Sequence, residues 1–600
     1  MLSALRLSFN AVALLGLLVL AGALGHAHFG RLDTPWEQLV LGKQLAEAKS
    51  IPKAEGILFT AAPHTPFDGR SWVWDLAAWE TGSAAGAGAL KTAEWGLWVL
   101  AIWALAAASF RRGARPFSTA LFCAWALAAA LPDLVPGPSL AGFTVFCVGL
   151  WIVEGDFWPA FFGRWIWLAP LAVLAVNLSP AAWALLPLAL GSALDGRPGV
   201  GAPARPALAK FLFLAVLGGC LCLHPQGISG TLLSLRHLAP SPLSPGAFAP
   251  RQWGLLFLAT AGALAVASGW TAAGKERLGR DAAVLAAFGA AALYSREALS
   301  YCLAAAAPTA AARFDALVDA LPALLRALRW PAKVAVLGGA AAFAWTAGVF
   351  ARTPAKESST LPSTTVTFYG NQLLDVDVLC PREWTPFLAW KLSPNARFAL
   401  DARGVAEPGR TAVLEAALRG DGDIAGALSQ QGVELCWLRR GSPAALALAS
   451  SQAWQPVAYD DASVLYVPCV PQNADLIRDH APRGLRPGDP GEPFDPTRLV
   501  QAEADLESGL AQDPGQGVVY LYLARLWSAK GYDAKSRQTL EAGVRADPNF
   551  AENYAQLAQE RAALGGEDNL VAARLLYDRA LALKDEPAWR EARVKLEGVK

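Results

Sequence analysis

The chain has 600 residues, of which 54% are hydrophobic and 17% are charged, and its formal net charge is +1. Such a low charged fraction, together with 23 tryptophans, is typical of a membrane protein and does not fit an ordinary soluble one. The near-zero net charge gives no sign of a basic surface, so we expect no nucleic acid among the partners.

Apolar segments dominate residues 1–352. The first follows Arg6 and runs from Phe9 to Leu24, and the small residues after it would also suit a cleaved signal peptide. We expect a retained helix, because further apolar segments follow. Several are shorter than the roughly 20 residues that a perpendicular span needs, but together they predict a bundle of about 11 spans. The later segments lie near 95–110, 117–132, 138–153, 165–178, 180–194, 209–224, 253–270, 282–298, 299–312 and 333–350.

The basic residues predict the orientation of this bundle. Arg111, Arg112 and Arg115 follow the second segment, and further Arg and Lys clusters lie at 197–210, 275–280 and 313–333. If the N-terminus is cytoplasmic, all of these clusters fall on the cytoplasmic side, as the positive-inside rule requires. An odd number of spans then places the C-terminal half outside the cytoplasm.

The loop between the first two spans, residues 28–93, is long and rich in acidic and aromatic residues. Asp33 lies directly after the first span and Asp75 lies near the end of the loop. Two interpretations stay open. The tryptophans could sit at headgroup level with the acids in water, or the loop could form an extracytoplasmic active site. The tryptophans are Trp36, Trp72, Trp74 and Trp79.

Residues 363–470 predict a small soluble α/β domain. A Pro-, Ser- and Thr-rich linker precedes it, and strand-like and helix-like segments then alternate, which favours a mainly parallel sheet. The last two strands are close enough to form a hairpin around Asp461. Asp401-Ala402-Arg403 closes a strand, where α/β folds bind ligands, so Arg403 is a candidate substrate contact. The alternative is an Asp401–Arg403 pair that only fixes the turn.

Cysteine usage suggests neither zinc nor a firm disulfide. Five of the eight cysteines lie in apolar segments and should pack as small hydrophobic side chains. Cys220 and Cys222 lack the spacing of a zinc site, so we expect no metal there. Of Cys380, Cys436 and Cys469, two could pair if this part is extracytoplasmic.

The last hundred residues carry an internal repeat after a Pro/Gly-rich linker at 471–496. Leu506-Glu-Ser-Gly509 leads to Asp513-Pro514, and Leu540-Glu-Ala-Gly543 leads to Asp547-Pro548, an offset of 548 − 514 = 34 residues. This is the period of a tetratricopeptide helix pair. Residues 497–600 therefore predict a short tetratricopeptide array, which either binds a protein partner or packs on the α/β domain.

Several short motifs occur in a fixed order along the chain. The first loop contains Asp33-Thr-Pro-Trp36 and Trp72-Val-Trp-Asp75-Leu76; later come Asn177-Leu178, His224-Pro-Gln-Gly227, Ser295-Arg296, Glu383-Trp-Thr-Pro-Phe-Leu-Ala-Trp390 and Asp401-Ala-Arg403. This order resembles that of bacterial polytopic membrane proteins of GT-C glycosyltransferase-like architecture. The resemblance spans roughly 28–470, and a C-terminal tetratricopeptide repeat also suits it.

The resemblance implies a membrane protein of the bacterial inner membrane that moves a sugar from a polyprenyl-phosphate lipid to an acceptor. Asp33 matches the acid that relatives use as catalytic base or metal ligand, and the resemblance leaves room for a divalent cation. Arg296 is the candidate for the leaving phosphate, with Asp75 and Arg403 as further substrate contacts. For Arg296 the alternative is a boundary pair with Glu297 that anchors a helix.

A second hypothesis is a non-catalytic membrane scaffold that binds protein partners through its repeats. Thr34 and Gln38 stand where proteins of this kind often carry Asp and His. Whether the chain is an enzyme therefore depends on Asp33, because a scaffold needs no acid at this position.

Overall fold

The computed structural model describes the chain in two units, Met1–Pro52 with Asp68–Ala355 and Lys53–Phe67 with Lys356–Lys600. The described residues are 14–16, 19, 21–23, 25, 36–52, 54, 56–62, 65, 67, 69, 71–131, 134, 136–154, 164–179, 183–193, 206–225, 258–261, 296–320, 361–372, 375–401, 403, 406–495 and 497–597.

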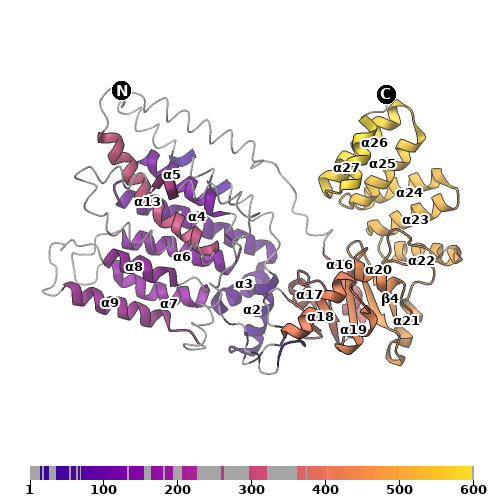
Figure 1. Cartoon of the computed structure of the whole chain (residues 1–600), viewed down its shortest axis with the longest axis horizontal. Helices are drawn as coiled ribbons and strands as arrows, with labels where there is room; N and C mark the ends of the chain where they lie inside the picture. The colour runs from indigo at the N-terminus through magenta and orange to yellow at the C-terminus, as the bar shows by residue number, and fades with distance from the viewer. Residues whose placement is uncertain are drawn as a thin grey trace. The chain divides into compact units, whose positions relative to one another are not determined.

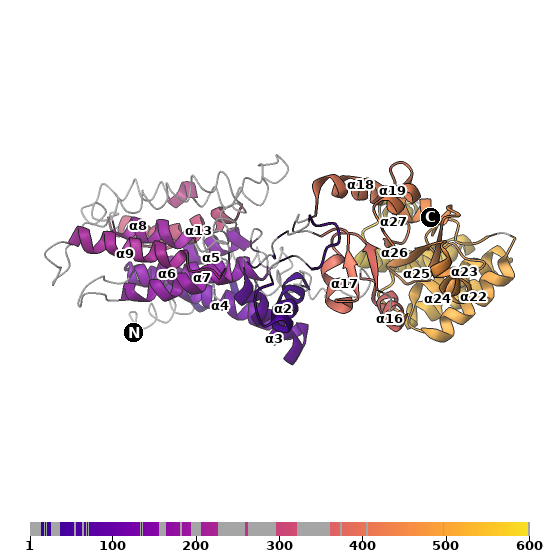
Figure 2. The same ribbon diagram turned by 90° about the horizontal axis from the view of Figure 1, so that it is seen from below.

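The first unit is a bundle of apolar helices (Figures 1 and 2). Three of them, α5, α6 and α9, begin with proline, whose missing N–H costs nothing at the first helical position. Gly137 precedes α6 with φ +99°, a conformation that favours glycine. The helices are α2 (Trp36–Ala48), α3 (Trp72–Ala85), α4 (Ala87–Arg111), α5 (Pro116–Ala130), α6 (Pro138–Val153), α7 (Leu168–Leu178), α8 (Leu185–Ala193), α9 (Pro206–Leu221) and α13 (Arg296–Ala320).

Helix α4 contains the candidate membrane span of this unit. Over the described residues, Gly88–Arg111 is the one helix both long and apolar enough to cross a membrane, and shorter apolar helices cover 116–130, 138–153, 168–178 and 211–221. Trp98 of α4 donates its Nε1 hydrogen to the carbonyl of Ala21 at 3.0 Å, which ties the first apolar segment to α4. The expected total of about 11 spans stays a prediction, because the segments at 253–270, 282–298 and 333–350 lie wholly or mainly outside the described residues.

Helix α13 differs from the expected pattern. We predicted that one span ends near Arg296 and that another covers 299–312, whereas one helix runs through Arg296–Ala320 with Pro308 inside it. Pro308 breaks no helix here because neighbouring helices can satisfy the freed backbone groups of a packed apolar helix.

The second unit contains a five-stranded sheet of order β2-β1-β3-β5-β4. The prediction of a mainly parallel sheet is wrong for the second half of the sheet. Strand β1 pairs in parallel with β2 and β3, but β5 pairs antiparallel with β3 and β4. The tight turn at Asp460–Ala462 forces this change, because it makes β4 and β5 a hairpin. The strands are β1 (Val376–Leu379), β2 (Ala396–Phe398), β3 (Leu435–Arg439), β4 (Trp454–Tyr459) and β5 (Ser463–Pro468).

Helices flank this sheet on two sides, with α18 and α19 opposite α16 and α17 (Figure 2). Asp423 and Ser442 cap α19 and α20 by accepting from Gly426 N at 3.0 Å and Ala445 N at 3.3 Å. The helices are α16 (Ser363–Gln372), α17 (Thr385–Leu392), α18 (Pro408–Arg419), α19 (Ile424–Gln430) and α20 (Pro443–Ala449).

A segment of the first loop extends the sheet beyond β2. Leu58 forms a parallel bridge with Phe398, and Ala61 forms an antiparallel bridge with Ala406. Residues 57–61, which we placed in the loop of the membrane body, therefore belong structurally to the second unit.

The tetratricopeptide part consists of helix pairs, and its first helices pack on the sheet domain. Over its described residues 471–495, the segment predicted as a linker contains α21 (Ala474–His480) and a bridge between Leu485 and Phe494. Leu485 is buried in the core of the repeat. Residues 567–570, which look like an insertion in the sequence, form the first turn of α26. The helices are α22 (Leu499–Gln512), α23 (Gly517–Ala529), α24 (Asp533–Ala546), α25 (Ala551–Leu564), α26 (Glu567–Leu583) and α27 (Pro587–Glu597).

All eight cysteines are unpaired. Cys380 and Cys436 are buried and Cys469 is exposed, so the structure contains none of the disulfides that we considered.

Candidate functional site

One end of the first unit brings together residues from three of the sequence motifs. The Trp72 indole nitrogen, in the first turn of α3, donates to Asn177 Oδ1 at 2.6 Å. Asn177, in the last turn of α7, donates through Nδ2 to the carbonyl of Leu223 at 3.1 Å, just after α9. We call this junction of α3, α7 and α9 the loop end. A side chain of the first loop is thus held by the ends of two apolar helices.

His224 adds a second link at the loop end. Its side chain is buried, and Nε2 donates to the carbonyl of Gly69 at 3.1 Å. The first loop is therefore fixed at Gly69 as well as at Trp72. His224 begins another of the quoted motifs, so the loop end joins three of these motifs.

Asp75 is fully buried in the first turn of α3. Ser71 Oγ donates to its Oδ2 at 3.2 Å. Helix α2 crosses α3 here so closely that a Cβ on Gly42 would lie 2.0 Å from the Asp75 carbonyl oxygen. Burying a carboxylate costs free energy unless hydrogen bonds compensate for the lost water. We therefore interpret Asp75 as a residue that stabilises the start of α3.

Two of the predicted site residues give no side-chain geometry. Asp33 lies outside the described residues. The backbone of Arg296 begins α13, whose Ser300 hydroxyl donates to the carbonyl of Ala130 at 3.3 Å. Tyr301 packs edge-on against Phe143 in the first half of α6, with ring centroids 5.9 Å apart. Arg296 therefore begins its helix at the same end of the bundle as the starts of α4 and α6.

Arg403 forms a compact pair with Asp401. The Arg403 backbone N–H donates to Asp401 Oδ1 at 3.1 Å, its Nε donates to Oδ2, and both side chains are almost fully buried. This geometry agrees with the alternative that we kept open, in which the pair fixes the turn after β2.

Sequence reasoning missed Glu94. We placed the second span at 95–110, but α4 begins at Ala87 and takes Lys91 and Glu94 into the helix. Glu94 is 1% exposed, and within the described part of the chain its Oε1 has no hydrogen-bond partner. Because Gly88–Arg111 is long and apolar enough to cross a membrane, its buried ionisable side chain makes Glu94 a candidate functional residue. A span boundary set one turn earlier would have revealed it.

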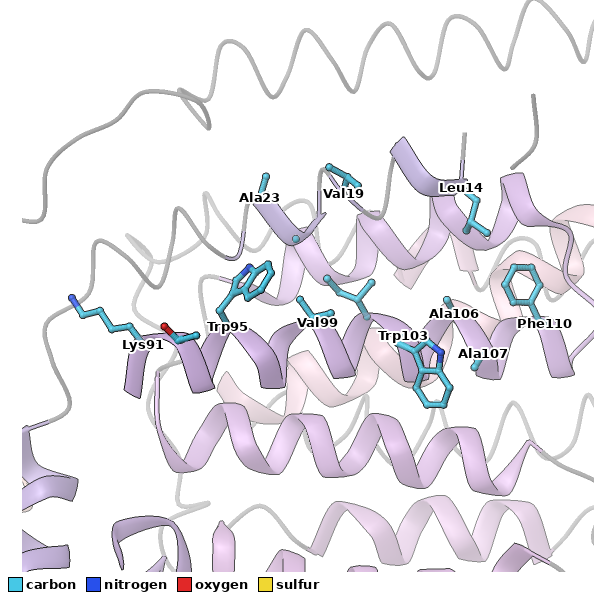
Figure 3. A pocket seen from close by; sticks show the side chains of 13 residues that line it. Leu14, Val19, Ala23, Lys91, Trp95, Val99, Trp103, Ala106, Ala107 and Phe110 are labelled. Atoms are coloured by element: carbon cyan, nitrogen blue, oxygen red, sulfur yellow. The ribbon is translucent and has the colours of Figure 1, made fainter. Parts of the chain in front are cut away.

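A long apolar groove runs beside α4 (Figure 3). Its volume is about 990 Å³; one wall is the α4 face with Trp95, Val99, Trp103 and Phe110, and Lys91 lies at one end. Lys91 and Phe110 are 19 residues apart, which corresponds to roughly 29 Å along a helix, close to the ~30 Å thickness of a bilayer core. The groove therefore has the length and lining for a lipid chain.

The opposite end of the bundle carries one buried and one half-exposed ion pair. Arg112 Nε lies 2.7 Å from Glu154 Oε2 with both side chains buried, and Arg112 also donates to Thr309. Arg115 pairs with Asp319 at 2.7 Å. We call this the arginine end. These contacts join α4, α6 and α13 and serve packing, because each cation already has an acidic partner.

The described residues contain no group of three or more His, Cys, Asp or Glu that could hold a metal ion. The divalent cation that the motifs leave room for would thus need residues outside the described ranges, such as Asp33.

Comparison with known proteins gives one family match and several similar structures. Residues 495–560 match the model of a tetratricopeptide repeat family. Similar solved structures include the arabinofuranosyltransferase AftD from Mycobacteria, at 15% identity and TM-score 0.47, with 77% of this chain and 40% of that chain covered. Another is ArnT from Cupriavidus metallidurans bound to undecaprenyl phosphate, at 11% identity and TM-score 0.46, with 78% and 98% covered.

The chain spans about 40% of the length of the arabinofuranosyltransferase that it matches. No curated protein matches it by sequence. The family match confirms the predicted tetratricopeptide repeat over residues 495–560.

Proposed function

We propose that the chain is a membrane glycosyltransferase-like protein that transfers a sugar from a polyprenyl-phosphate carrier at the outer face of a bacterial inner membrane. The proposal rests on the loop end, where hydrogen bonds link three motifs that together span more than 150 residues of the sequence. Trp72, Asn177 and His224 are the motif residues that form these bonds. At this level of likeness to solved structures no reaction is defined, so the support comes from the chain's own residues.

The outer surface of the bundle supports a lipid environment. Large apolar side chains are exposed on several helices, among them Trp103 at 51%, Trp167 at 65% and Phe211 at 67%. In water such a surface would drive association, whereas lipid tails accept it at no cost.

The groove along α4 suits the apolar tail of a lipid carrier. Its lining is almost entirely apolar, and Lys91 lies at its rim toward the start of α4. A tail lying in the groove would bring its phosphate to that rim, where a lysine stabilises negative charge. The tail and the sugar would then meet the protein at the end where the first loop is held.

The proposed chemistry needs a base in the first loop. An acceptor hydroxyl is a weak nucleophile, so a carboxylate must take its proton as it attacks the anomeric carbon; we assign this role to Asp33. Arg296 is proposed to offset the charge of the departing polyprenyl phosphate. Asp75 and Arg403, which we predicted as substrate contacts, are buried and paired, and we propose that they act by holding α3 and the turn after β2.

The test is sugar transfer by the purified full-length protein from a panel of polyprenyl-phosphate sugars. Asp33→Asn should lower the rate by about two to four orders of magnitude at normal abundance, because it preserves shape and removes the base. Glu37→Gln, in the first turn of α2, is the matched control and should retain transfer. Equal rates for Asp33→Asn and the wild type would reject Asp33 as the base.

A scaffold remains the second candidate, favoured by the repeat match and by a polar cavity in the second unit. This cavity, about 550 Å³, lies between α16, β4, α21 and α22, and its lining includes Asn371, Arg483 and Asp505. A scaffold predicts that deleting 497–600 abolishes function in cells while Asp33→Asn has no effect. The reverse pattern would support the transferase.

A further inference from the structure

The sheet domain binds a strand from the first loop. Phe398 N donates to the carbonyl of Ile57 at 2.8 Å, and Phe59 N donates to the carbonyl of Phe398 at 3.1 Å. These two bonds on either side of Phe398 are the pattern of a parallel strand pair. Residues 57–61 therefore cover the edge of β2, which would otherwise present unpaired backbone groups.

Side chains strengthen this pairing on both sides of the strand. Thr60 is fully buried, its hydroxyl donates to the carbonyl of Ala399 at 2.5 Å, and Glu407 N donates to the carbonyl of Thr60 at 3.1 Å. Ile57 and Leu58 are also buried. A loop segment with this density of contacts is bound in the way a peptide is bound by strand addition.

Arg410 recognises the same strand from α18. Its Nη1 donates to the carbonyl of Phe59 at 3.2 Å, and its guanidinium lies 5.4 Å from the centre of the Phe59 ring. Its Nε and Nη2 donate to the side chain and the backbone carbonyl of Gln431 at 3.0 and 2.8 Å. Arg410 thus joins the loop strand to two helices of the domain, which a lysine could not do with one ammonium group.

The position of this strand in the chain gives it a consequence for the loop end. It lies 57 − 33 = 24 residues after Asp33 and 72 − 61 = 11 residues before Trp72. Eleven residues reach at most roughly 40 Å when fully extended, so a fixed strand limits where the rest of the loop can go.

We infer that the sheet domain is a clamp for the first loop, with Arg410 and Thr60 as positioning residues for the proposed sugar transfer. The clamp holds residues 57–61 and thereby fixes one end of the segment that leads to Trp72. This inference rests on the proposed function only in its catalytic part, because the pairing itself can be measured without turnover.

The first arm of the test measures the clamp by amide hydrogen exchange of residues 57–62 in the full-length protein. Arg410→Ala and Thr60→Val should each speed exchange about 5–30-fold, because each removes one buried partner of the strand. Thr60→Ser keeps the hydroxyl and should restore protection. Arg419→Ala is the matched control, since Arg419 is exposed on the same helix and pairs only with exposed Asp421 among the described contacts. Unchanged exchange in both loosening variants would overturn the clamp.

The second arm tests whether the clamp positions the first loop for sugar transfer. It measures the transfer rate of a loosened variant with and without an engineered disulfide. Arg410→Ala should lower kcat with little change in KM for the donor. Ala61→Cys with Ala406→Cys, at bridge partners, can form a disulfide that should restore kcat in the Arg410→Ala background and lose this effect on reduction. A cross-link that restores protection but not kcat would overturn the positioning role. No transfer by the wild type would refute the proposed function and the positioning role with it, while the exchange data still decide whether the domain holds the loop.

Discussion

Arg440 should decide whether the repeat stays attached to the sheet domain. Its Nε and Nη2 donate to the carbonyl of Asp461 at 3.3 and 3.2 Å, and its Nη1 donates to Tyr522 Oη at 3.3 Å. Its guanidinium also lies 5.4 Å from the Phe550 ring. Arg440→Met keeps the apolar stem but removes these contacts, which together should cost about 2–4 kcal/mol of docking free energy.

The assay is hydrogen exchange across α23 in the full-length protein. A loss of about 2–4 kcal/mol corresponds to roughly 30–1000-fold faster exchange of amides that open with the junction, since about 1.4 kcal/mol is a factor of ten. Arg439→Met is the matched control, because Arg439 forms a half-exposed pair with Glu383 that should be worth about 1 kcal/mol or less. If α23 exchanges at the wild-type rate in Arg440→Met, the junction is not held as described.

Three further changes test other parts of the account. Trp72→Phe removes the donor to Asn177 and should destabilise the loop end by about 1–3 kcal/mol, seen as a lower melting temperature in detergent; no shift would mean that this bond contributes nothing. Gly42→Ala should destabilise the first unit by about 1–3 kcal/mol through overpacking on α3, whereas Gly88→Ala meets open space in α4 and should be neutral or stabilising; equal melting temperatures for the two variants would contradict the close crossing. Burial raises the pKa of Asp461 from 3.8 to about 7, so the folded chain keeps a proton that the unfolded chain releases, and stability should fall as pH rises from about 4 to about 7. Asp461→Asn should flatten this part of the pH profile, and an unchanged profile would reject the assignment.

The strands of the sheet domain could be predicted from the sequence because each is a short apolar run between turn residues. The alternating strand-like segments expected within 363–470 include β3 at Leu435–Arg439 and β5 at Ser463–Pro468. The hairpin around Asp461 was predicted correctly. The antiparallel pairing of β3 with β5 was not predicted, because periodicity specifies which residues form strands but not which strands become neighbours.

The contact between the first loop and β2 could not be read from the sequence. The partners Thr60 and Ala399 lie 339 positions apart, and residues 57–61 are too few to show a strand period. The prediction of a linker at 471–496 failed for a different reason. Its Pro/Gly content is typical of a linker, but Gly484 and Gly488 are there because backbone and a Tyr466 hydroxyl lie where a Cβ would be.

The sequence named several residues of the candidate site, but it did not predict what each side chain does in the fold. The quoted motifs contain Trp72, Asn177 and His224, but the motif order did not predict that hydrogen bonds link these parts of the chain. The sequence also could not show that Asp75 is buried or that Arg403 forms an ion pair with Asp401. Burial and pairing depend on how helices cross and how turns close.

The central claim is that the first unit binds a lipid-linked sugar at the loop end. The most direct measurement is electron cryomicroscopy of the full-length protein with a polyprenyl phosphate, to locate the phosphate and the tail. The account predicts tail density in the groove along α4 and the phosphate near Lys91, at the end where Trp72 and Asn177 meet. A phosphate at the arginine end, beside Arg112 or Arg115, or no bound lipid in the groove, would contradict it.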